Sequence, residues 1–215
     1  MTTSGSRWDQ SAMVERMSSN TGRRYPPAFW EFLESAVLPR AGEAPAVADL
    51  GCGPGLLLQE LASRLPNAAL RGVDVSEAML ANAGGLDYAT GAPSFTKHDL
   101  NDAPYPLEDA SLDLCISANV VCFLDNPLVL FAEARRMLRP GGVYLLYDWK
   151  RQALTDYIEN RGGFGDDPTA MMSLQPHHNR FTAEEWRWLL AEGGFDVVGE
   201  AHPRVSHVAL ACAPR

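Results

Sequence analysis

A glycine-rich turn between an apolar segment and a helical segment carries the strongest chemical signal in the sequence. Val47–Leu50 is apolar apart from Asp49, and Gly51, Gly53 and Gly55 follow it before a leucine-rich segment. Glycine allows tight turns and lets main-chain groups approach a ligand without interference from a Cβ atom. We therefore expect the backbone of this turn to contact a small ligand.

A second acid stands where it could bind a ribose. The next apolar run ends at Asp74, and a carboxylate about twenty residues after such a turn can bind the hydroxyl groups of an adenosine ribose. Dinucleotide enzymes use the spacing G-x-G-x-x-G because a pyrophosphate sits on the helix N-terminus. Position 56 is leucine, which leaves G-x-G-x-G. This spacing favours a ligand without phosphates.

The elements that would position these residues alternate along the chain. Short apolar segments predict strands at Ala46–Leu50, Ala69–Val73, Ser94–Lys97, Leu112–Ser117 and Val143–Tyr147. Helical periodicity predicts helices at Gly55–Leu65, Ser76–Ala83 and Pro127–Leu138. This alternation is typical of a parallel sheet with helices on both faces.

The last part of the chain predicts an antiparallel pair of strands. A helix over Thr182–Ala191 precedes two apolar segments, Phe195–Glu200 and Val205–Cys212. Their connection, His202–Arg204, is too short for a crossover helix. We therefore predict an α/β fold with a seven-stranded, mostly parallel sheet, helices on both faces and a C-terminal antiparallel hairpin.

Four segments, in this order, resemble the motifs of class I S-adenosylmethionine-dependent methyltransferases. The glycine-rich turn resembles their first motif, and Phe95–Leu100 resembles the motif after the third strand. Leu112–Asn119 resembles the motif at the end of the fourth strand, and Met137–Gly142 the turn before the fifth. The likeness covers roughly residues 46–146 and, more weakly, the final hairpin. It implies the class I methyltransferase fold, with S-adenosylmethionine as cofactor and S-adenosylhomocysteine as its product.

The resemblance implies contacts to the adenosine part of this cofactor. Asp74 stands at the position of the ribose-binding acid. Val75 and Met79 would pack on adenine, although Met79 could equally be a core residue of its helix. Asp99 would accept from the adenine amino group, and the next backbone amide, that of Leu100, would reach the ring.

The resemblance also implies contacts to the methionine part. The backbone of Gly51–Gly53 would face it, and Asp49 would bind its amino group directly or through a water; alternatively, Asp49 is a structural acid that stabilises the turn. Ser117 or Asn119 would lie beside the same amine. Tyr25 precedes a predicted helix, where related enzymes often place a tyrosine or an arginine on the cofactor's carboxylate.

Aromatic side chains dominate the segments expected around the methyl acceptor. Those expected to bind it are Phe29, Phe123, Tyr147 and Trp149. Such rings suit a flat, largely apolar acceptor and could stabilise a positive charge; ordinary packing of a lid on the core is the alternative. The stretch after the fourth strand lacks the Asn/Asp-Pro-Pro-Tyr run of many amino-group enzymes, and oxygen, nitrogen and carbon acceptors all remain open.

A catalytic base is needed only if the accepting atom must lose a proton. The sulfonium is already activated, so the enzyme mainly aligns the two reactants and excludes water. His177, His178 and Asp148 are the candidate bases, because imidazole titrates near neutral pH and a carboxylate could orient it. The alternative is an exposed pair of loop histidines and an acid at a strand end.

Composition excludes several other classes of function. The formal net charge of −9 repels phosphate backbones, so we expect no nucleic-acid partner. No apolar run is long enough to cross a bilayer, and the N-terminus lacks the features of a secretory signal, so we expect no membrane partner and a cytoplasmic protein. The four cysteines have no metal-ligand spacing, and we expect no metal.

These observations predict one domain with four segments. The segments are an N-terminal helical cover with a helix over Pro26–Leu38 that Pro39 stops (1–40), a cofactor-binding half (46–147), a substrate-side lid without regular pattern (148–181), and a C-terminal helix and hairpin (182–215). We expect methyl transfer to a small aromatic or heterocyclic metabolite or natural-product intermediate, by a monomer or homodimer. The alternatives are a nicotinamide-dependent oxidoreductase and a non-methylating S-adenosylmethionine-binding protein.

Overall fold

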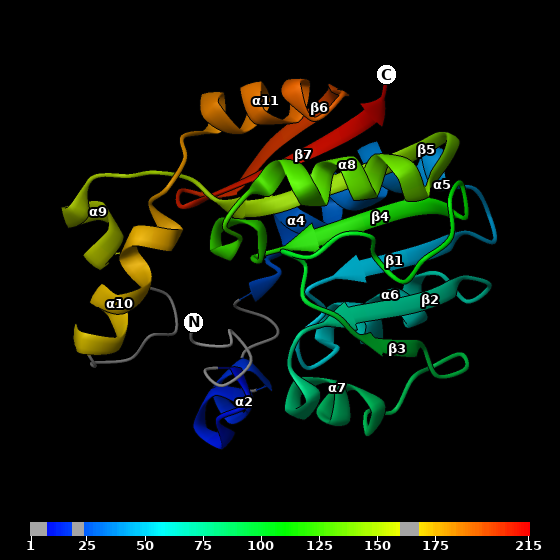
Figure 1. Cartoon of the computed structure of the whole chain (residues 1–215), viewed down its shortest axis with the longest axis horizontal. Helices are drawn as coiled ribbons and strands as arrows, with labels where there is room; N and C mark the ends of the chain where they lie inside the picture. The colour runs from blue at the N-terminus through cyan, green and yellow to red at the C-terminus, as the bar shows by residue number, and fades with distance from the viewer. Residues whose placement is uncertain (1–7, 19–23, 160–167) are drawn as a thin grey trace.

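A seven-stranded sheet forms the centre of the computed structural model, which describes residues 8–18, 24–159 and 168–215 (Figure 1). The strand order is β3-β2-β1-β4-β5-β7-β6. The strands are β1 (Ala46–Leu50), β2 (Ala69–Asp74), β3 (Ser94–Lys97), β4 (Leu112–Ala118), β5 (Leu138–Trp149), β6 (Phe195–Arg204) and β7 (His207–Pro214).

The pairing pattern confirms the predicted mostly parallel sheet with an antiparallel C-terminal hairpin. β1 pairs in parallel with β2 and β4, and β4 pairs in parallel with β5. β7 runs antiparallel to both of its neighbours, β5 and β6. The chain moves outward from β1 to β3 and then returns to β4 on the other side of β1. This reversal of strand order lies between β1 and β4, where open α/β sheets bind their ligands.

Helices cover both faces of the sheet, as predicted (Figure 1). One face packs against α4 (Pro27–Phe32), the π-helix η1 (Leu33–Val37), α5 (Leu38–Ala41) and α6 (Leu56–Arg64). The other face packs against α8 (Pro127–Met137) and α11 (Ala183–Glu192). Alternate residues of each strand supply the two cores; in β4, for example, Ile116 faces α4 and α6, whereas Cys115 faces α8.

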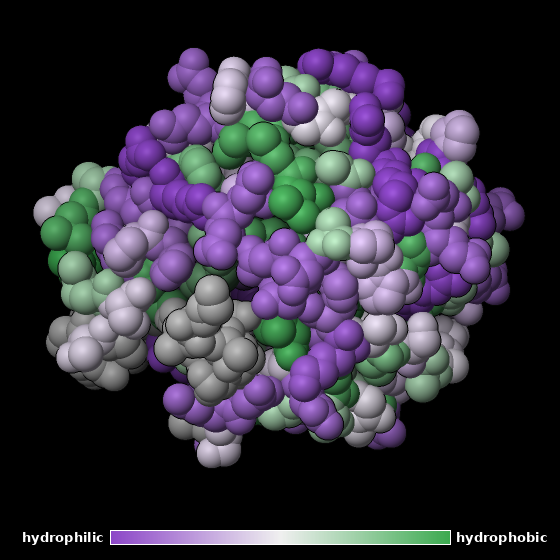
Figure 2. All heavy atoms as spheres, in the orientation of Figure 1, coloured by the Kyte–Doolittle hydropathy of each residue, from purple (hydrophilic) through white to green (hydrophobic). Residues whose placement is uncertain are grey.

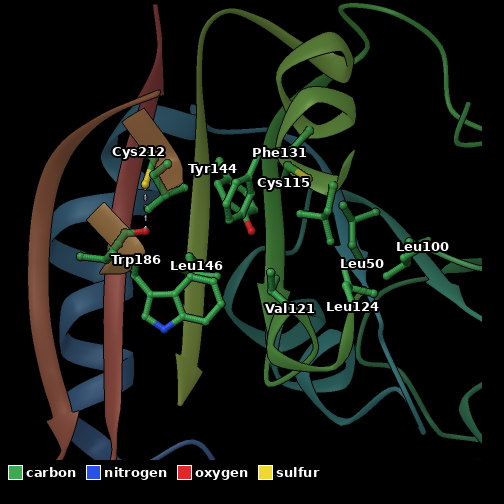
Figure 3. Packing of buried hydrophobic residues seen from close by; sticks show 14 of the residues in the cluster. Leu50, Leu100, Cys115, Val121, Leu124, Phe131, Tyr144, Leu146, Trp186 and Cys212 are labelled. Carbon is green, nitrogen blue, oxygen red and sulfur yellow. Dashed lines mark hydrogen bonds between the residues drawn. The ribbon is translucent and has the colours of Figure 1, made fainter. Parts of the chain in front are cut away.

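Aromatic rings fill the core on the α8 side (Figure 3). Tyr144 of β5 lies between Phe131 and Phe195, with ring centroids 5.8 and 5.3 Å away. Trp186 of α11 is fully buried, and its Nε1 donates to the backbone oxygen of Trp149, 2.8 Å away. This packing anchors β5 and the hairpin, so the ends of these strands offer a rigid support for a binding site.

The remaining helices lie mostly at the carboxyl ends of the parallel strands. Figure 1 shows α2 (Ser11–Ser18), α9 (Leu154–Glu159) and α10 (Pro168–His178) on that side of the sheet. α7 (Glu77–Gly84) packs beside β2 and β3, and η2 (Val121–Phe123) is a short 3-10 helix after β4. Figure 2 shows a largely hydrophilic face with apolar residues over α9, where Leu154 and Ile158 are exposed. None of the described helices is long and apolar enough to cross a membrane.

Two expectations about helices are wrong. Pro39 does not stop the first long helix, which continues to Ala41 through the π-helix η1. The Leu38 N–H donates to the Leu33 oxygen, five residues back, and this wider turn accommodates a proline that would clash with the carbonyl four residues before it. The stretch before Thr182 is also not irregular, because α9 and α10 lie within it.

Two expectations about turns are also wrong. His202–Arg204 does not connect the last strands but extends β6, and the turn is Val205–Ser206. Pro203 is tolerated there because β6 is an edge strand, where a missing N–H breaks no ladder. Likewise β5 begins before the predicted strand: Leu138 and Val143 both pair with β4, and the residues between them bulge outward.

Candidate functional site

A pocket opens at the carboxyl ends of β1, β2 and β4, at the reversal of strand order. Its lining includes ten residues that the sequence predicts to bind cofactor or substrate: Tyr25, Gly51, Gly53, Asp74, Val75, Met79, Asp99, Leu100, Asn119 and Phe123. The sequence did not predict the others: Trp8, Met17, Arg24, Cys52, Asn101, Ala118, Val120 and Leu124. The predicted residues therefore converge from several elements on one cavity.

The glycine-rich turn forms the floor of the pocket because its backbone adopts conformations that glycine favours. Gly51 has a φ of 79° and Gly53 a φ of 52°. A Cβ atom on Gly51 would lie 2.4 Å from a methyl group of Val120, so the loop after β4 could not pack so closely. The N–H groups of Gly51 and Cys52 both donate to the Val73 oxygen, at 2.7 and 3.0 Å. These bonds tie the turn to the end of β2.

Asp74 is placed by two backbone amides. Gly53 N–H donates to its Oδ2 at 2.8 Å, and Ser76 N–H donates to its Oδ1 at 2.9 Å. Burial raises the pKa of Asp74, and these N–H donors oppose the rise. A carboxylate has about four lone-pair sites, so each oxygen can still accept a bond from a ligand hydroxyl. This arrangement fits the predicted ribose contact.

Asp49 is a buried acid whose Oδ1 has no hydrogen-bond partner within the described residues. It is 2% exposed, is the penultimate residue of β1, and does not line the pocket. Burial, with a smaller contribution from the charge of Asp74, raises the pKa of Asp49 to about 8. Buried polar atoms are almost always satisfied, so this oxygen fits a cationic ligand group such as an ammonium.

We expect Asp49→Asn to stabilise the ligand-free protein at high pH. The pKa of Asp49 is higher in the folded chain than in the unfolded chain, where it is about 3.9. The favourable contribution of Asp49 to the free energy of unfolding is therefore fully present below about pH 4. It is lost progressively as the pH rises from there through 8. At about 1.4 kcal/mol per pKa unit, the gain from Asp49→Asn should be roughly 4 kcal/mol larger at pH 9 than at pH 5, because the loss extends over the three units from pH 5 to 8.

Denaturant unfolding of both proteins at the two pH values measures this gain. Asp87→Asn, at an exposed position, is the matched control. Its free energy of unfolding should differ from that of the wild type by the same small amount at both pH values. An equal effect of Asp49→Asn at pH 5 and pH 9 would show that Asp49 is not a strongly perturbed acid.

Arg24 is the main charged pocket residue that the sequence did not select. It lines the pocket, and its Nη2 lies 3.1 Å from the Met17 sulfur. Burial lowers its pKa, and no carboxylate of the described residues lies within salt-bridge distance of it. A cation in this position fits a ligand carboxylate. Its signal in the sequence was its place directly before Tyr25, the predicted carboxylate-binding residue.

Tyr25 lines the pocket as a neutral phenol. Its ring packs against Phe29 and Tyr147, with centroids 5.1 and 6.2 Å away, and burial raises the pKa of its hydroxyl. Phe29 and Tyr147 are fully buried and do not line the pocket. Tyr147 instead supports it, because its hydroxyl donates to the Arg24 oxygen, 3.2 Å away.

The opposite wall of the pocket is suited to a flat base. Met79 is 2% exposed and lines the cavity together with Val75, so Met79 is both a core residue and a pocket residue. Asp99 Oδ1 accepts from the backbone and side-chain nitrogens of Asn101, both at 3.0 Å. Leu100 is 4% exposed and also lines the pocket. An apolar surface beside an acid and a backbone amide fits the predicted adenine contacts.

At the end of β4 the structure distinguishes between the two residues expected beside the cofactor's amine. Ser117 is buried and hydrogen-bonded to the Tyr144 hydroxyl in the core. Asn119 lines the pocket. It has a φ of 59°, its N–H donates to the Tyr147 oxygen at 2.8 Å, and its Oδ1 lies 2.9 Å from His207 Nε2.

The three candidate bases lie outside the lining of this pocket. Asp148 is fully buried, and its two oxygens accept from the backbone N–H groups of Cys122 and Trp149, at 3.2 and 2.7 Å. Burial raises the pKa of Asp148 to about 6. The side chain faces the amides of the loop after β4, so its observed contacts stabilise that loop.

The two histidines and Trp149 lie behind Phe123. The ring centroids of His177 and His178 are 5.1 and 5.5 Å from that of Phe123. Of the four aromatic residues predicted to bind the methyl acceptor, Phe123 is the one that lines the pocket. His178 is 3% exposed and stacks on Trp149 at 4.0 Å, and its Nδ1 lies 3.1 Å from the Tyr157 hydroxyl. Phe123 therefore separates the described pocket from this cluster.

The described residues hold no group of three or more side chains that could bind a metal ion. The polar groups in and beside the pocket instead suit an organic ligand with distinct parts. Arg24 is a cation and Asp74 a carboxylate in the lining, Met79 adds an apolar surface there, and Asp49 lies beside the glycine turn with an unpartnered oxygen. An adenosyl amino acid carries groups that match each of these.

Comparisons with known proteins agree with this geometry. A family model described as a methyltransferase domain matches residues 48–146. A malonyl-[acyl-carrier protein] O-methyltransferase from Hahella chejuensis is 36% identical over 110 residues, which cover 49% of this chain and 37% of that protein. An uncharacterized 37.1 kDa protein in transposon TN4556 of Streptomyces fradiae is 31% identical over 152 residues, covering 69% of this chain and 42% of that protein.

Solved structures show the same fold at lower identity. The crystal structure of a SAM-dependent methyltransferase from Aquifex aeolicus has a TM-score of 0.70 at 18% identity, covering 94% of this chain and 97% of that one. The chain spans less than half of the length of the two curated relatives.

Proposed function

Because the chain belongs to the class I S-adenosylmethionine-dependent methyltransferase family, we propose that it transfers the methyl group of S-adenosylmethionine to a small molecule. The observation that carries the proposal is an unsatisfied acid beside the glycine turn together with an arginine that lines the pocket. Asp49 Oδ1 lacks a partner, and Arg24 lacks a carboxylate partner, among the described residues. A ligand with an ammonium and a carboxylate group satisfies both.

Two acids near the glycine turn disfavour a dinucleotide. A pyrophosphate on the turn would lie close to Asp49 and Asp74, which bear or gain negative charge, and the turn lacks the third glycine of the dinucleotide pattern. The strand order also differs from that of dinucleotide-binding sheets. Those sheets commonly run 3-2-1-4-5-6 without an antiparallel hairpin, whereas this sheet runs 3-2-1-4-5-7-6. Both features support the adenosyl ligand over the nicotinamide alternative.

We assign each part of the cofactor to residues of the pocket. Asp49 would bind the ammonium group, Arg24 the carboxylate and Asp74 the ribose, while Met79 and Asp99 would contact adenine. When bound, S-adenosylmethionine supplies a methyl group on an already activated sulfonium. The protein has to orient the acceptor and exclude water, and the apolar wall formed by Trp8, Phe123 and Leu124 would do so.

We propose a small aromatic or heterocyclic metabolite, or a natural-product intermediate, as acceptor. Trp8 and Phe123 lie edge to face with their centroids 5.2 Å apart and both line the pocket, as does Tyr25. Such rings suit a flat acceptor. His177 and His178 remain the proposed bases for an acceptor that must lose a proton; they contact Phe123 and would need this ring to move aside.

A transfer assay tests the function. The protein is incubated with methyl-labelled S-adenosylmethionine and a panel of small aromatic and heterocyclic compounds that carry hydroxyl, amino or carboxyl groups. We expect at least one labelled product together with S-adenosylhomocysteine, and none with Asp74→Ala. Binding of S-adenosylmethionine without turnover across the whole panel would overturn methyl transfer and favour a non-methylating adenosyl-binding protein.

A further inference from the structure

A chain of three hydrogen-bonded side chains reaches the pocket from the last hairpin. Ser206 Oγ lies 2.8 Å from His207 Nδ1, and His207 Nε2 lies 2.9 Å from Asn119 Oδ1. Ser206 and His207 are buried, at 3% and 4% exposure, while Asn119 lines the pocket. We call Ser206, His207 and Asn119 the relay. It connects the turn between β6 and β7 to the ligand site.

β5 holds two of the three relay residues, His207 and Asn119. The His207 ring stacks on Tyr147, with centroids 5.0 Å apart and planes inclined by 27°, and it lies 4.2 Å from the Trp149 ring. The backbone of His207 pairs with Trp149 across the β5–β7 ladder. Asn119 donates its N–H to the Tyr147 oxygen at 2.8 Å. The imidazole and the carboxamide therefore meet in a fixed geometry.

The buried hydroxyl of Ser206 sets the position of the hydrogen on His207. In the described part of the chain this hydroxyl has no acceptor except His207 Nδ1. A buried donor without an acceptor is rarer than an unused lone pair, so Ser206 donates and Nδ1 accepts. A neutral imidazole then carries its hydrogen on Nε2. Burial lowers the pKa of His207, and its interactions with Arg204, His178 and Lys150 lower it further.

The orientation of Asn119 follows from this tautomer. Since Nε2–H donates, the carboxamide oxygen must face His207, and the amide nitrogen faces away from it. No residue that the structure describes accepts a hydrogen bond from this nitrogen. Asn119 therefore presents a hydrogen-bond donor to a ligand, although the sequence predicted it beside the cofactor's amine, which needs an acceptor.

We infer that the relay makes Asn119 a donor to a carboxylate oxygen of the cofactor's methionine part, with His207 and Ser206 as positioning residues. This rests on the proposed function. Tyr147 supports the assignment because it contacts both residues. Its backbone oxygen accepts from the Asn119 N–H, and its hydroxyl donates to the backbone oxygen of Arg24. Arg24 is the cation proposed for the same carboxylate, so two donors would converge on it. An oxygen of the methyl acceptor has the same chemistry and is the competing source.

Asn119→Asp tests whether the side chain of Asn119 donates a hydrogen bond to the ligand or accepts one from it. It keeps the shape of the side chain and the bond from His207, but it replaces the amide donor with a charged acceptor. Calorimetry compares S-adenosylhomocysteine with 5′-methylthioadenosine, which lacks the amino-acid part. We expect about 10-fold weaker binding of the first ligand and unchanged binding of the second. Asn101→Asp is the matched control, because it adds the same charge on the adenine side of the pocket and should affect both ligands alike.

Two outcomes would overturn the inference. Tighter binding of S-adenosylhomocysteine by Asn119→Asp would mean that the side chain faces the ammonium group. Unchanged binding of both ligands would mean that it contacts the methyl acceptor instead. If the wild-type protein did not bind S-adenosylhomocysteine at all, the proposed function itself would fail, and this result is distinguishable from the other two.

The tautomer gives a test that does not depend on Asn119 variants. Long-range proton–nitrogen NMR of the folded wild-type protein should show His207 with a protonated Nε2 and an unprotonated Nδ1. Ser206→Ala removes the donor to Nδ1; we expect a mixture of tautomers and about 3-fold weaker binding of S-adenosylhomocysteine, with 5′-methylthioadenosine unaffected. A wild-type ring protonated on Nδ1 alone would refute the relay.

Discussion

Replacing Asp74 with alanine is expected to weaken binding of S-adenosylhomocysteine by about 100-fold. Each carboxylate oxygen of Asp74 already accepts one backbone N–H, from Gly53 or Ser76, and is therefore fixed for a ribose hydroxyl. Hydrogen bonds to a charged group contribute about 1.5–3 kcal/mol each, and two of them exceed the roughly 2.7 kcal/mol that a 100-fold change requires. Isothermal titration calorimetry measures the loss directly.

Two further variants separate binding from folding. Asp87→Ala, at an exposed position after α7, should bind like the wild type. Asp74→Asn keeps an oxygen for one of the two backbone amides and should bind with intermediate affinity. Wild-type affinity in a folded Asp74→Ala protein would remove Asp74 from the site.

Replacing Arg24 with methionine is expected to weaken binding of S-adenosylhomocysteine by roughly 30- to 100-fold. Methionine keeps much of the apolar stem that packs in the pocket wall but removes the guanidinium, which faces no carboxylate of the described chain. A ligand carboxylate left in the site without this cation loses a charge-assisted, potentially bidentate pair. The dissociation constants for wild type and variant give the effect.

A ligand without an amino-acid part is the sharpest comparison for Arg24. 5′-Methylthioadenosine should bind Arg24→Met and wild type equally well, because it has no carboxylate. Arg40→Met, on exposed α5, controls for the change in net charge and should leave both affinities unchanged. Equal losses for both ligands would place Arg24 in a structural role rather than on the carboxylate.

Local sequence was sufficient for the strands that carry the centre of the site. Asp49 lies near the end of β1, the glycine turn follows this strand, and Asp74 ends β2, so the side-by-side pairing of these strands brings them together without further information. The observed bounds of β1 and β3 agree with the predicted ones. The antiparallel hairpin could be predicted because its short connection leaves no other pairing.

Residues that reach the site from distant segments could not be predicted in the same way. Arg24 precedes α4, and His207 begins β7; their approach to the pocket depends on tertiary packing around Tyr147. Apart from the position of Arg24 next to Tyr25, no local pattern distinguishes these two residues from an ordinary surface arginine or a strand histidine.

The regular alternation of side chains breaks at the end of β5, and the local contacts there explain why the expected bases lie elsewhere. Tyr147 packs with the α4 side of the sheet and Trp149 with the α8 side, and Asp148 between them turns to the amides after β4. A position at a strand end places a residue near the pocket, but the direction of its side chain depends on neighbouring loops. The helices α9 and α10 place His178 against Trp149, behind Phe123.

Calorimetric titration of the unmodified protein with S-adenosylhomocysteine tests the central claim that this pocket holds a phosphate-free adenosyl amino acid. We predict saturable binding at one site per chain, with no binding of NADH under the same conditions. A folded protein that takes up NADH, or that gives no heat with S-adenosylhomocysteine at any pH at which Asp49 is ionised, would contradict the account.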